Sequence, residues 1–457
     1  MFQLISPVDG SLYHERPAGT LDEARAAIAK ARKAQAEWVR VPIAERAAMV
    51  RRAIEHLRTV DDDVVTELAW MMGRPVQYGG EVGDVEERAF YMADIAEEAL
   101  KPIEIEMSNA RHRMIKRMPF GVVLVIAPWN YPYLTAVNTI VPALIAGNAV
   151  FLKHSEQTML AGDRFADGMK AAGLPEGLFI NMMLEHDTIG TLIQERAFGF
   201  VNFTGSVAGG QAVERVAAGT FTSIGLELGG KDAAYVMEDF DVDAKAEEMI
   251  TGAMFNNGQC CCSIERLYIA APVYDRVLEK IVSVVEGLKL GNPLDPETSI
   301  GPMAHRRFAD AVRKQVAEAI EQGATPMIDP ALFPEDDGGT YLAPQILTNV
   351  TNDMPFMRDE SFGPVVGVMK VESDEEAIAL INDSDYGLAA SLWTNDMTRA
   401  EGIADQLEVG TVWMNKVEYL DPALCWTGCK NTGRGGALSV IGYQSVTRPK
   451  SYHLSMA

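Results

Sequence analysis

Apolar residues recur along the first hundred residues with the spacing of amphipathic helices. Between residues 21 and 59 they return every three to four positions in two blocks that Pro42 separates. Charged residues fill the positions between them, so we expect two helices that each bury one face. Residues 62–100 have a similar pattern and are strongly acidic. The basic patch at 111–117 is expected to form a solvated strand or loop.

The pattern changes near residue 121, where short and wholly apolar runs begin. Residues 122–127 form a continuous apolar run, which is typical of a strand buried on both faces. A loop and a helix that ends near Ala146 follow. Strand–helix alternation of this kind indicates a mostly parallel sheet with helices on both faces, which binds ligands at the carboxyl ends of its strands. The alternation continues with strands expected at 149–152, 179–184, 199–203 and 223–227 and helices at 159–171, 188–194 and 208–218.

A second α/β region begins near Lys231. Its pattern predicts strands at 267–270 and 365–370 and helices at 274–288, 304–322 and 374–383.

The stretch from 119 to 152 carries no charged residue and is long enough to span a membrane. Its prolines and asparagines disfavour a span, because unsatisfied backbone groups are costly in lipid. We therefore expect a buried strand–loop–helix–strand unit there.

Composition narrows the classes of partner. Of the 457 residues, 48% are hydrophobic and 23% are charged, which excludes disorder for most of the chain. The net charge of −24 disfavours binding to nucleic acid or to anionic lipid. The five cysteines are an odd number and three are consecutive, so we expect free thiols in a reducing cytoplasm. The N-terminus has neither a basic segment nor a long apolar core, so no secretory signal is expected.

Three consecutive thiols, Cys260, Cys261 and Cys262, follow a glycine-containing turn. A lone buried cysteine is usually inert, but three after a turn favour a nucleophile. A metal site is the weaker interpretation, because adjacent side chains point different ways and no nearby histidine completes a ligand set. Cys425 and Cys429 lie far along the chain, and we expect both to be structural.

Glu227 stands between apolar residues at the end of a predicted strand. Burial raises a carboxyl pKa towards the range of a general base, although a hydrogen-bonded loop carboxylate would give the same pattern. Gly205 and Ser206 also end a strand, where a glycine turn can hold a phosphate at a helix N-terminus, but the pattern is not the G-x-G-x-x-G fingerprint. Lys153 and Glu156 follow another strand, where they could contact a nucleotide ribose or form a surface turn.

Taken together, these segments resemble the aldehyde dehydrogenase superfamily. The motifs occur in the order and spacing of that family, from about residue 6 to the C-terminus. They are Ala127-Pro128-Trp129-Asn130, Lys153-His154-Ser155-Glu156, Phe203-Thr204-Gly205-Ser206, Glu227-Leu228-Gly229-Gly230-Lys231, Gly258-Gln259-Cys260-Cys261, Gly301-Pro302-Met303, Glu360-Ser361-Phe362-Gly363-Pro364 and Trp413-Met414-Asn415.

The resemblance implies an architecture and an assembly. It implies a Rossmann-like cofactor domain at 1–100 and 120–230 and an α/β catalytic domain at 231–430. A small β arm, formed by 101–119 and 446–457, should join subunits into a homodimer or homotetramer. Departures from the family are His154, where proline is usual, and Trp426-Thr427-Gly428, which replaces part of Pro-Phe-Gly-Gly near the substrate mouth.

The resemblance also implies an activity and residue roles. The enzyme would oxidise an aldehyde to the carboxylic acid with NAD, or with NADP, through a thioester on Cys261. Asn130 matches the oxyanion donor and Glu227 the general base that activates water. The implied cofactor-binding residues are Trp129, Lys153, Glu156, Gly205, Ser206, Glu360 and Phe362. The implied substrate-pocket residues are Tyr131, Thr135, Asn138, Cys260, Cys262, Leu420 and Trp426.

Two alternatives stay open at this point. One is a CoA-acylating aldehyde dehydrogenase, which the presence of Glu227 disfavours. The other is a catalytically silent binding homologue, which the intact Cys261, Glu227 and Asn130 disfavour. The substrate is unassigned: none of the implied pocket residues is cationic, which disfavours a carboxylate-bearing semialdehyde, and nearby Glu418 would suit an amino aldehyde.

Overall fold

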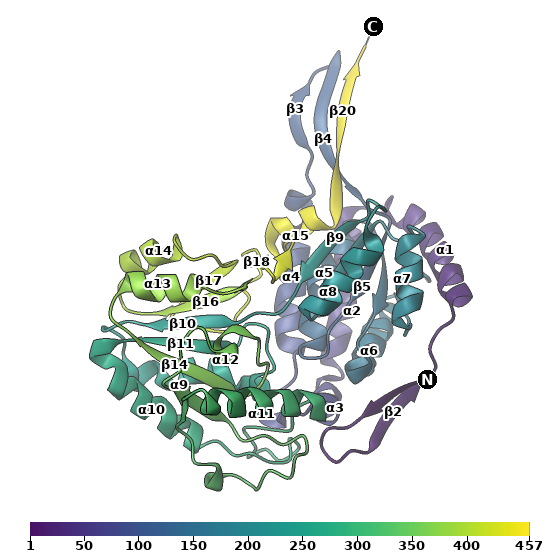
Figure 1. Ribbon diagram of the computed structural model, residues 1–457. Coiled ribbons are helices and arrows are strands. Elements are labelled where there is room, and N and C mark those ends of the chain that lie inside the picture. The colour runs from purple at the N-terminus through teal and green to yellow at the C-terminus, as the bar shows by residue number, and fades with distance from the viewer. Residues whose placement is uncertain (457) are drawn as a thin grey trace.

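The computed structural model describes residues 1–456 and shows two α/β bodies with a β arm that projects from one of them (Figure 1). One body is built on a six-stranded sheet and the other on a seven-stranded sheet. None of the helices in these residues is long and apolar enough to cross a membrane. The stretch from 119 to 152 instead forms strand β5, helix α5 and strand β6.

The six-stranded sheet has the order β19-β9-β8-β5-β6-β7, and all its strands are parallel except β19. The chain runs outward in one direction from β5 to β7 and then returns to place β8 and β9 on the other side of β5. Ligands bind at such a switch point, beyond the carboxyl ends of the strands. The strands are β5 (Val122–Ile126), β6 (Ala149–Lys153), β7 (Phe179–Asn181), β8 (Phe200–Thr204), β9 (Ser223–Glu227) and β19 (Gly433–Arg434).

Helices surround this sheet, as the alternating pattern predicts. Their apolar faces share one buried core with the strands. Thr20 caps α1 in a capping box with Glu23, while Gly73 ends α3 in a left-handed conformation with φ of 84°. The helices are α1 (Leu21–Trp38), α2 (Ile43–Arg58), α3 (Asp61–Met72), α4 (Val82–Ala99), α5 (Pro132–Ile145), α6 (Met159–Ala171), α7 (His186–Gln194) and α8 (Val207–Ala217).

The seven-stranded sheet has the order β12-β13-β14-β11-β10-β16-β17. Alternate residues of β10 enter different cores: Tyr235 packs on one face and Val236 on the other. The strands are β10 (Asp232–Val236), β11 (Ile264–Ala270), β12 (Thr325–Pro326), β13 (Gln345–Thr348), β14 (Val365–Val371), β16 (Ala389–Trp393) and β17 (Thr411–Met414). The helices are α9 (Val242–Met254), α10 (Tyr274–Glu286), α11 (Arg306–Glu321), α12 (Pro355–Arg358), α13 (Asp374–Asn382) and α14 (Met397–Ala404).

The arm is a three-stranded antiparallel sheet of β3 (Ile103–Met107), β4 (Arg111–Pro119) and β20 (Thr447–Ser455). It extends away from both bodies in Figure 1, and helix α15 (Ser439–Ser445) leads into β20. The basic patch of the sequence lies on β4. Large apolar side chains are exposed along the arm, namely Ile103, Ile105, Met107, Leu454 and Met456. A separate hairpin of β1 (Phe2–Ile5) and β2 (Leu12–Arg16) lies at the N-terminus.

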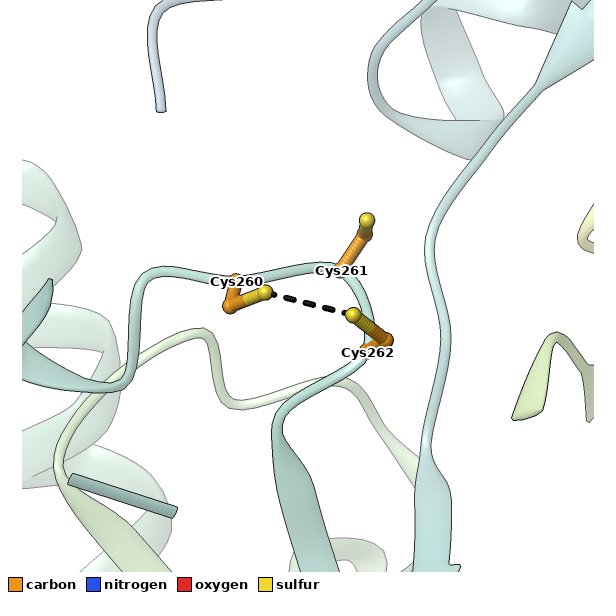
Figure 2. Close-up of side chains that lie close together, drawn as sticks. All are labelled: Cys260, Cys261 and Cys262. Atoms are coloured by element: carbon orange, nitrogen blue, oxygen red, sulfur yellow. Dashed lines mark hydrogen bonds between the residues drawn. The ribbon is translucent and has the colours of Figure 1, made fainter. Parts of the chain in front are cut away.

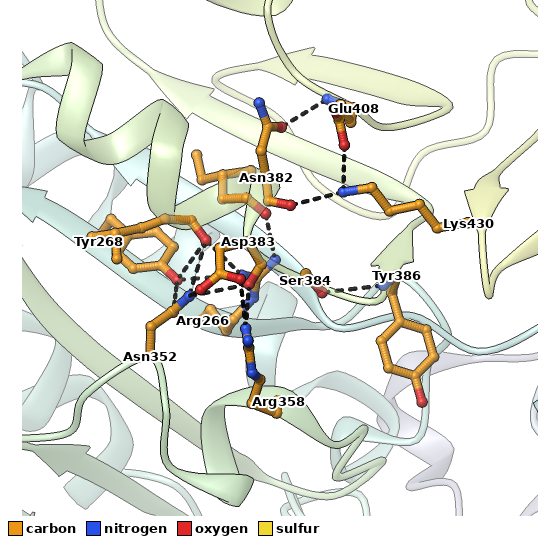
Figure 3. A network of polar contacts seen from close by, with 12 residues as sticks. Arg266, Tyr268, Asn352, Arg358, Asn382, Asp383, Ser384, Tyr386, Glu408 and Lys430 are labelled. Atoms are coloured by element: carbon orange, nitrogen blue, oxygen red, sulfur yellow. Dashed lines mark hydrogen bonds and ion pairs between the residues drawn. The ribbon is translucent and has the colours of Figure 1, made fainter.

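A polar network fixes the loop after α13 (Figure 3). Asp383 accepts hydrogen bonds from Asn352 and Arg358 at 3.0 and 2.8 Å, through its carboxylate and its carbonyl oxygen respectively. Lys430 donates to the carbonyl of Asn382 at 2.8 Å. These contacts join the loop to the small sheet of β15 (Tyr386–Gly387) and β18 (Cys429–Lys430). The network thereby holds the segment that leads to Leu388, which lines the candidate site.

Candidate active site

A cavity of about 240 Å³ brings together residues from both bodies. Cys261 comes from the loop before β11, and Glu227 is the last residue of β9. The seven side chains that the family resemblance implies for a substrate pocket line this same cavity: Tyr131, Thr135, Asn138, Cys260, Cys262, Leu420 and Trp426.

The cysteine loop depends on unusual backbone conformations. Asn256, Asn257 and Gly258 follow one another with φ of 51°, 59° and 70°. A side chain at Gly258 would place Cβ 2.0 Å from the carbonyl oxygen of Gly363, so only glycine fits there. This turn reverses the chain after α9 and presents the three thiols to the cavity.

Adjacent thiols point different ways, as expected from the sequence, but the first and third thiols face each other. The sulfurs of Cys260 and Cys262 lie 3.4 Å apart, and Cys261 projects on the other side of the loop (Figure 2). All three sulfurs lie within 4.8 Å of one another, because the tight turn returns Cys262 to Cys260. Contacts with these two neighbours lower the pKa of Cys261, so its thiolate is favoured.

Glu227 is held at the carboxyl end of the sheet beside the cavity. Burial raises the pKa of its carboxyl group to about 7, while a hydrogen bond from Thr204 and the charge of Arg88 oppose the rise. The hydroxyl of Thr204 donates to Glu227 Oε2 at 3.4 Å. A carboxyl group with this pKa can accept a proton near neutral pH.

Asn130 is fixed to the cysteine loop through its backbone. Its carbonyl oxygen accepts hydrogen bonds from Arg74 at 2.7 Å and from Asn256 at 3.2 Å. Asn130 is buried, and its side-chain amide makes no hydrogen bond within the described part of the chain. The amide is therefore available as a donor to a ligand.

A buried ion pair between Lys231 and Glu265 holds the loop that contains Ser361. Lys231 Nζ lies 2.6 Å from Glu265 Oε2, and both side chains are almost fully buried. The carboxylate of Glu265 also accepts hydrogen bonds from the backbone N–H groups of Ser361 and Phe362. The neighbouring Glu360 accepts from the backbone of Gly230 at 2.9 Å, and burial raises the pKa of Glu360 to about 8.

A second cavity, of about 660 Å³, lies at the switch point of the six-stranded sheet. Lys153 and Ser206 line it, and Ser206 caps helix α8 by accepting a hydrogen bond from the N–H of Gly209. Cβ atoms at Gly205 or Gly209 would lie 2.9 or 2.5 Å from the ring of Phe203, so the backbone stays bare at the helix N-terminus. These features fit the phosphate and ribose of a dinucleotide.

Trp129, Glu156, Glu360 and Phe362, which are also implied in cofactor binding, do not line this second cavity. Trp129 stacks on Phe308 with ring centroids 5.1 Å apart and meets the edge of Phe362 at 5.5 Å. Glu360 belongs to the same loop as Phe362. Glu156 is exposed in a short helical turn after β6 and does not line either cavity.

Comparison with known proteins decides the family. Residues 1–452 match the aldehyde dehydrogenase family. The chain belongs to the aldehyde dehydrogenase family. An aldehyde dehydrogenase of Paenarthrobacter nicotinovorans is 35% identical over 98% of both chains. Betaine aldehyde dehydrogenase 2 of Rhizobium meliloti is 32% identical over 99% of this chain and 94% of its own.

Solved structures agree with this assignment. The structure of succinic semialdehyde dehydrogenase from Streptococcus pyogenes in complex with NADP⁺ aligns over 100% of both chains with a TM-score of 0.94 and 28% identity. The α/β fold expected from the sequence is confirmed. The protein is an NAD(P)-dependent aldehyde dehydrogenase that oxidises an aldehyde to the acid.

Sequence reasoning missed several residues that line this aldehyde dehydrogenase's cavity. Arg74 and Arg88 both contribute, so the cavity is not free of cations as the implied pocket residues suggested. Arg88 lies on α4, where an arginine is an ordinary helix residue, and Arg74 lies in the loop after α3. No local signal marks either one, because only tertiary packing brings them to the thiols. Tyr78, Glu81 and Phe255 were missed for the same reason.

Proposed function

We propose that catalysis begins with attack of the Cys261 thiolate on the aldehyde carbon. A C–S bond forms, and the carbonyl oxygen becomes the oxyanion of a thiohemiacetal. The amide of Asn130 and the backbone N–H of Cys261 stabilise this oxyanion, a contribution typically worth about 3–4 kcal/mol. The lowered pKa of Cys261 supports this role, because the thiolate is the reactive species.

Collapse of the oxyanion expels a hydride and leaves a thioester on Cys261. NAD(P)⁺, when bound, would supply the acceptor for that hydride. Glu227 then takes a proton from water, and the resulting hydroxide attacks the thioester carbonyl. Cleavage of the C–S bond releases the acid and returns Cys261 to its thiolate form. The single observation that carries this proposal is the shared cavity of Cys261 and Glu227, in which burial sets the pKa of Glu227 to about 7.

The cofactor is proposed to lie along the carboxyl edge of the six-stranded sheet. Gly205 and Ser206 would hold the pyrophosphate at the N-terminus of α8, and Lys153 and Glu156 would contact the adenosine ribose. Glu360, Phe362 and Trp129 would contact the nicotinamide end. The bare backbone at Gly205 and the buried cation of Lys153 support this placement. We propose that NAD is preferred over NADP.

Domain roles and assembly follow from the same proposal. Residues 1–100 and 120–230 would form the cofactor domain and residues 231–430 the catalytic domain. The arm of 101–119 and 446–457 would join subunits into a homodimer or homotetramer, which its exposed apolar side chains support. We place the protein in the reducing cytoplasm, since its five cysteines are free thiols.

The test is a product assay with a neutral short aldehyde. Purified enzyme, NAD⁺ and butanal should give NADH and butanoate in equal amounts, and mass spectrometry of the trapped enzyme should find the acyl group on the peptide that carries Cys261. Added CoA should not divert the product to acyl-CoA. Acyl-CoA as the main product, or an acyl group on another residue, would refute the proposal.

A further inference from the structure

The substrate cavity contains a carboxyl group with one oxygen atom that has no hydrogen-bond partner among residues 1–456. Glu418 lies in the loop after β17, has φ of 55° and lines the cavity. Its Oε1 atom is buried and has no hydrogen-bond partner in the described part of the chain. Burial raises the pKa of Glu418 well above its usual range, and negative charge on Cys260 raises it further. An unpaired polar atom inside a ligand cavity is costly and indicates a donor supplied by the ligand.

The cations of the cavity do not supply that donor. Arg74 uses its three nitrogens on Asn256, Glu81 and the carbonyl of Asn130, at 3.2, 2.8 and 2.7 Å. The carboxylate of Glu81 is almost fully buried beside it and compensates its charge. Arg74 therefore makes no hydrogen bond to Glu418, and its positive charge only partly opposes the rise in the pKa of Glu418.

Arg88 is likewise engaged with other groups. Its Nη1 atom donates to the carbonyl of Leu134 and to the side chain of Asn138, at 3.1 and 3.2 Å. The charges that act on Arg88 are those of Asp84, Glu81, Cys262 and Glu227. Arg88 therefore interacts with these four groups and makes no hydrogen bond to Glu418.

The rest of the lining favours a positively charged group. Aromatic faces attract cations, and the aromatic side chains that line the cavity are Tyr78, Tyr131, Phe255, Tyr419 and Trp426. The rings of Tyr131 and Tyr419 already have Arg74 and Lys416 at 4.7 and 3.7 Å from their centroids, so Tyr78, Phe255 and Trp426 are the rings left for a ligand. Asp84 and Glu87 are exposed where they line it, so a cation approaching from solvent meets negative charge.

We propose that Glu418 determines specificity and that the substrate is a short aldehyde with a protonated amine, whose ammonium group donates to the free oxygen of Glu418. This inference rests on the proposed function, because the aldehyde carbon must meet Cys261. Glu418 lines the same cavity as Cys260 and Cys261, so a short aldehyde can place its ammonium group at Glu418 and its carbonyl carbon at Cys261. Burial favours the neutral carboxyl group until the substrate binds, so binding of the ammonium group is coupled to ionisation of Glu418, which releases its proton.

The test compares two aldehydes of nearly equal shape. 3-Aminopropanal and butanal differ by an ammonium group in place of a methyl group. The wild-type enzyme should show kcat/KM about 10–100-fold higher for 3-aminopropanal, the range expected for a hydrogen bond between charged groups. Glu418→Gln should bring this ratio close to one, and Glu418→Asp should retain part of the preference. Glu401→Gln, at an exposed position on α14, is the matched control and should keep the wild-type ratio.

Three results would overturn the inference. They are a wild-type ratio near one, an unchanged ratio in Glu418→Gln, and a preference for succinate semialdehyde, which would point to recognition of a carboxylate by Arg88. If butanal is still oxidised through Cys261 in these cases, the proposed function stands and only the substrate class is wrong. If neither aldehyde is oxidised, both fail together.

Discussion

The sulfur atoms of Cys260 and Cys262 lie 3.4 Å apart, while the thiol between them faces the opposite side of the loop (Figure 2). This geometry separates the roles of three chemically identical side chains. The two outer thiols are buried, and their contacts with Cys261 lower its pKa. Contact with Cys260 and Cys261 raises the pKa of Cys262 well above its usual range. A single thiolate at Cys261 is therefore the favoured ionised form.

We expect Cys261→Ala to abolish NAD⁺ reduction, because no other thiolate faces the aldehyde. Cys260→Ala and Cys262→Ala serve as matched controls and should retain measurable turnover. Initial rates of NADH formation at 340 nm, a wavelength at which NADH absorbs, compare the three variants at about neutral pH. Wild-type activity in Cys261→Ala would contradict the assignment of the nucleophile.

A second expectation concerns the cofactor. The Glu156 carboxylate can accept hydrogen bonds from ribose hydroxyls, whereas a 2′-phosphate would meet a like charge. The buried cation of Lys153 partly offsets this repulsion. The enzyme should therefore have a higher kcat/KM for NAD⁺ than for NADP⁺. Glu156→Gln should bring the two kcat/KM values closer together. Glu401→Gln is the control, and a clear wild-type preference for NADP⁺ would reject the prediction.

The sequence predicted best where patterns are strongly periodic and well punctuated. Helix α6 and strand β9 have the bounds expected from the sequence, at 159–171 and 223–227. Cys261 and Glu227, which lie far apart in the chain, also line one cavity. Motifs at strand ends could be placed together because parallel strands deliver their carboxyl ends to the same edge of a sheet.

Other elements could not be read from local sequence. Strands β10 and β16 were not predicted, since their small residues Ala233, Ala234, Ala389 and Ala390 give a weak strand signal although both strands are fully buried. The charges of the cavity were missed because Arg74 and Arg88 reach it only through packing. Glu418 could be noticed in the sequence, but its unpaired oxygen is a property of the fold.

Arg74→Met should lower stability markedly. Arg74 and Glu81 have side chains that are 3% and 2% exposed, so the variant leaves a carboxyl group buried without its cation. Loss of one partner of such a pair costs about 3–5 kcal/mol. Arg25→Met is the control: Arg25 forms exposed pairs with Asp22 and Glu195, which contribute about 0–1 kcal/mol. The apparent melting temperatures of the two variants measure these losses. Equal melting temperatures for Arg74→Met and Arg25→Met would show that the Arg74–Glu81 pair does not stabilise the fold more than an exposed pair does.

Glu227→Gln tests the fate of the thioester. Glutamine keeps the shape of the side chain but cannot accept the proton of water, so steady turnover should fall by about 10²–10⁴. A burst of up to one NADH per active site should remain, because thiolate attack and hydride transfer do not need Glu227 once Cys261 is ionised. Stopped-flow absorbance separates the burst from the slow phase, with Glu401→Gln as the control.

The pH dependence of the same step gives an independent check. The base acts in its deprotonated form, and burial raises the pKa of Glu227 to about 7. Where hydrolysis limits turnover, kcat should therefore be low below pH 7, rise through that range and level off above it. Glu227→Gln should lose this rise, and added CoA should neither restore the rate nor appear in the main product. Unimpaired acid production by Glu227→Gln, or an unchanged pH profile, would show that another group activates the water.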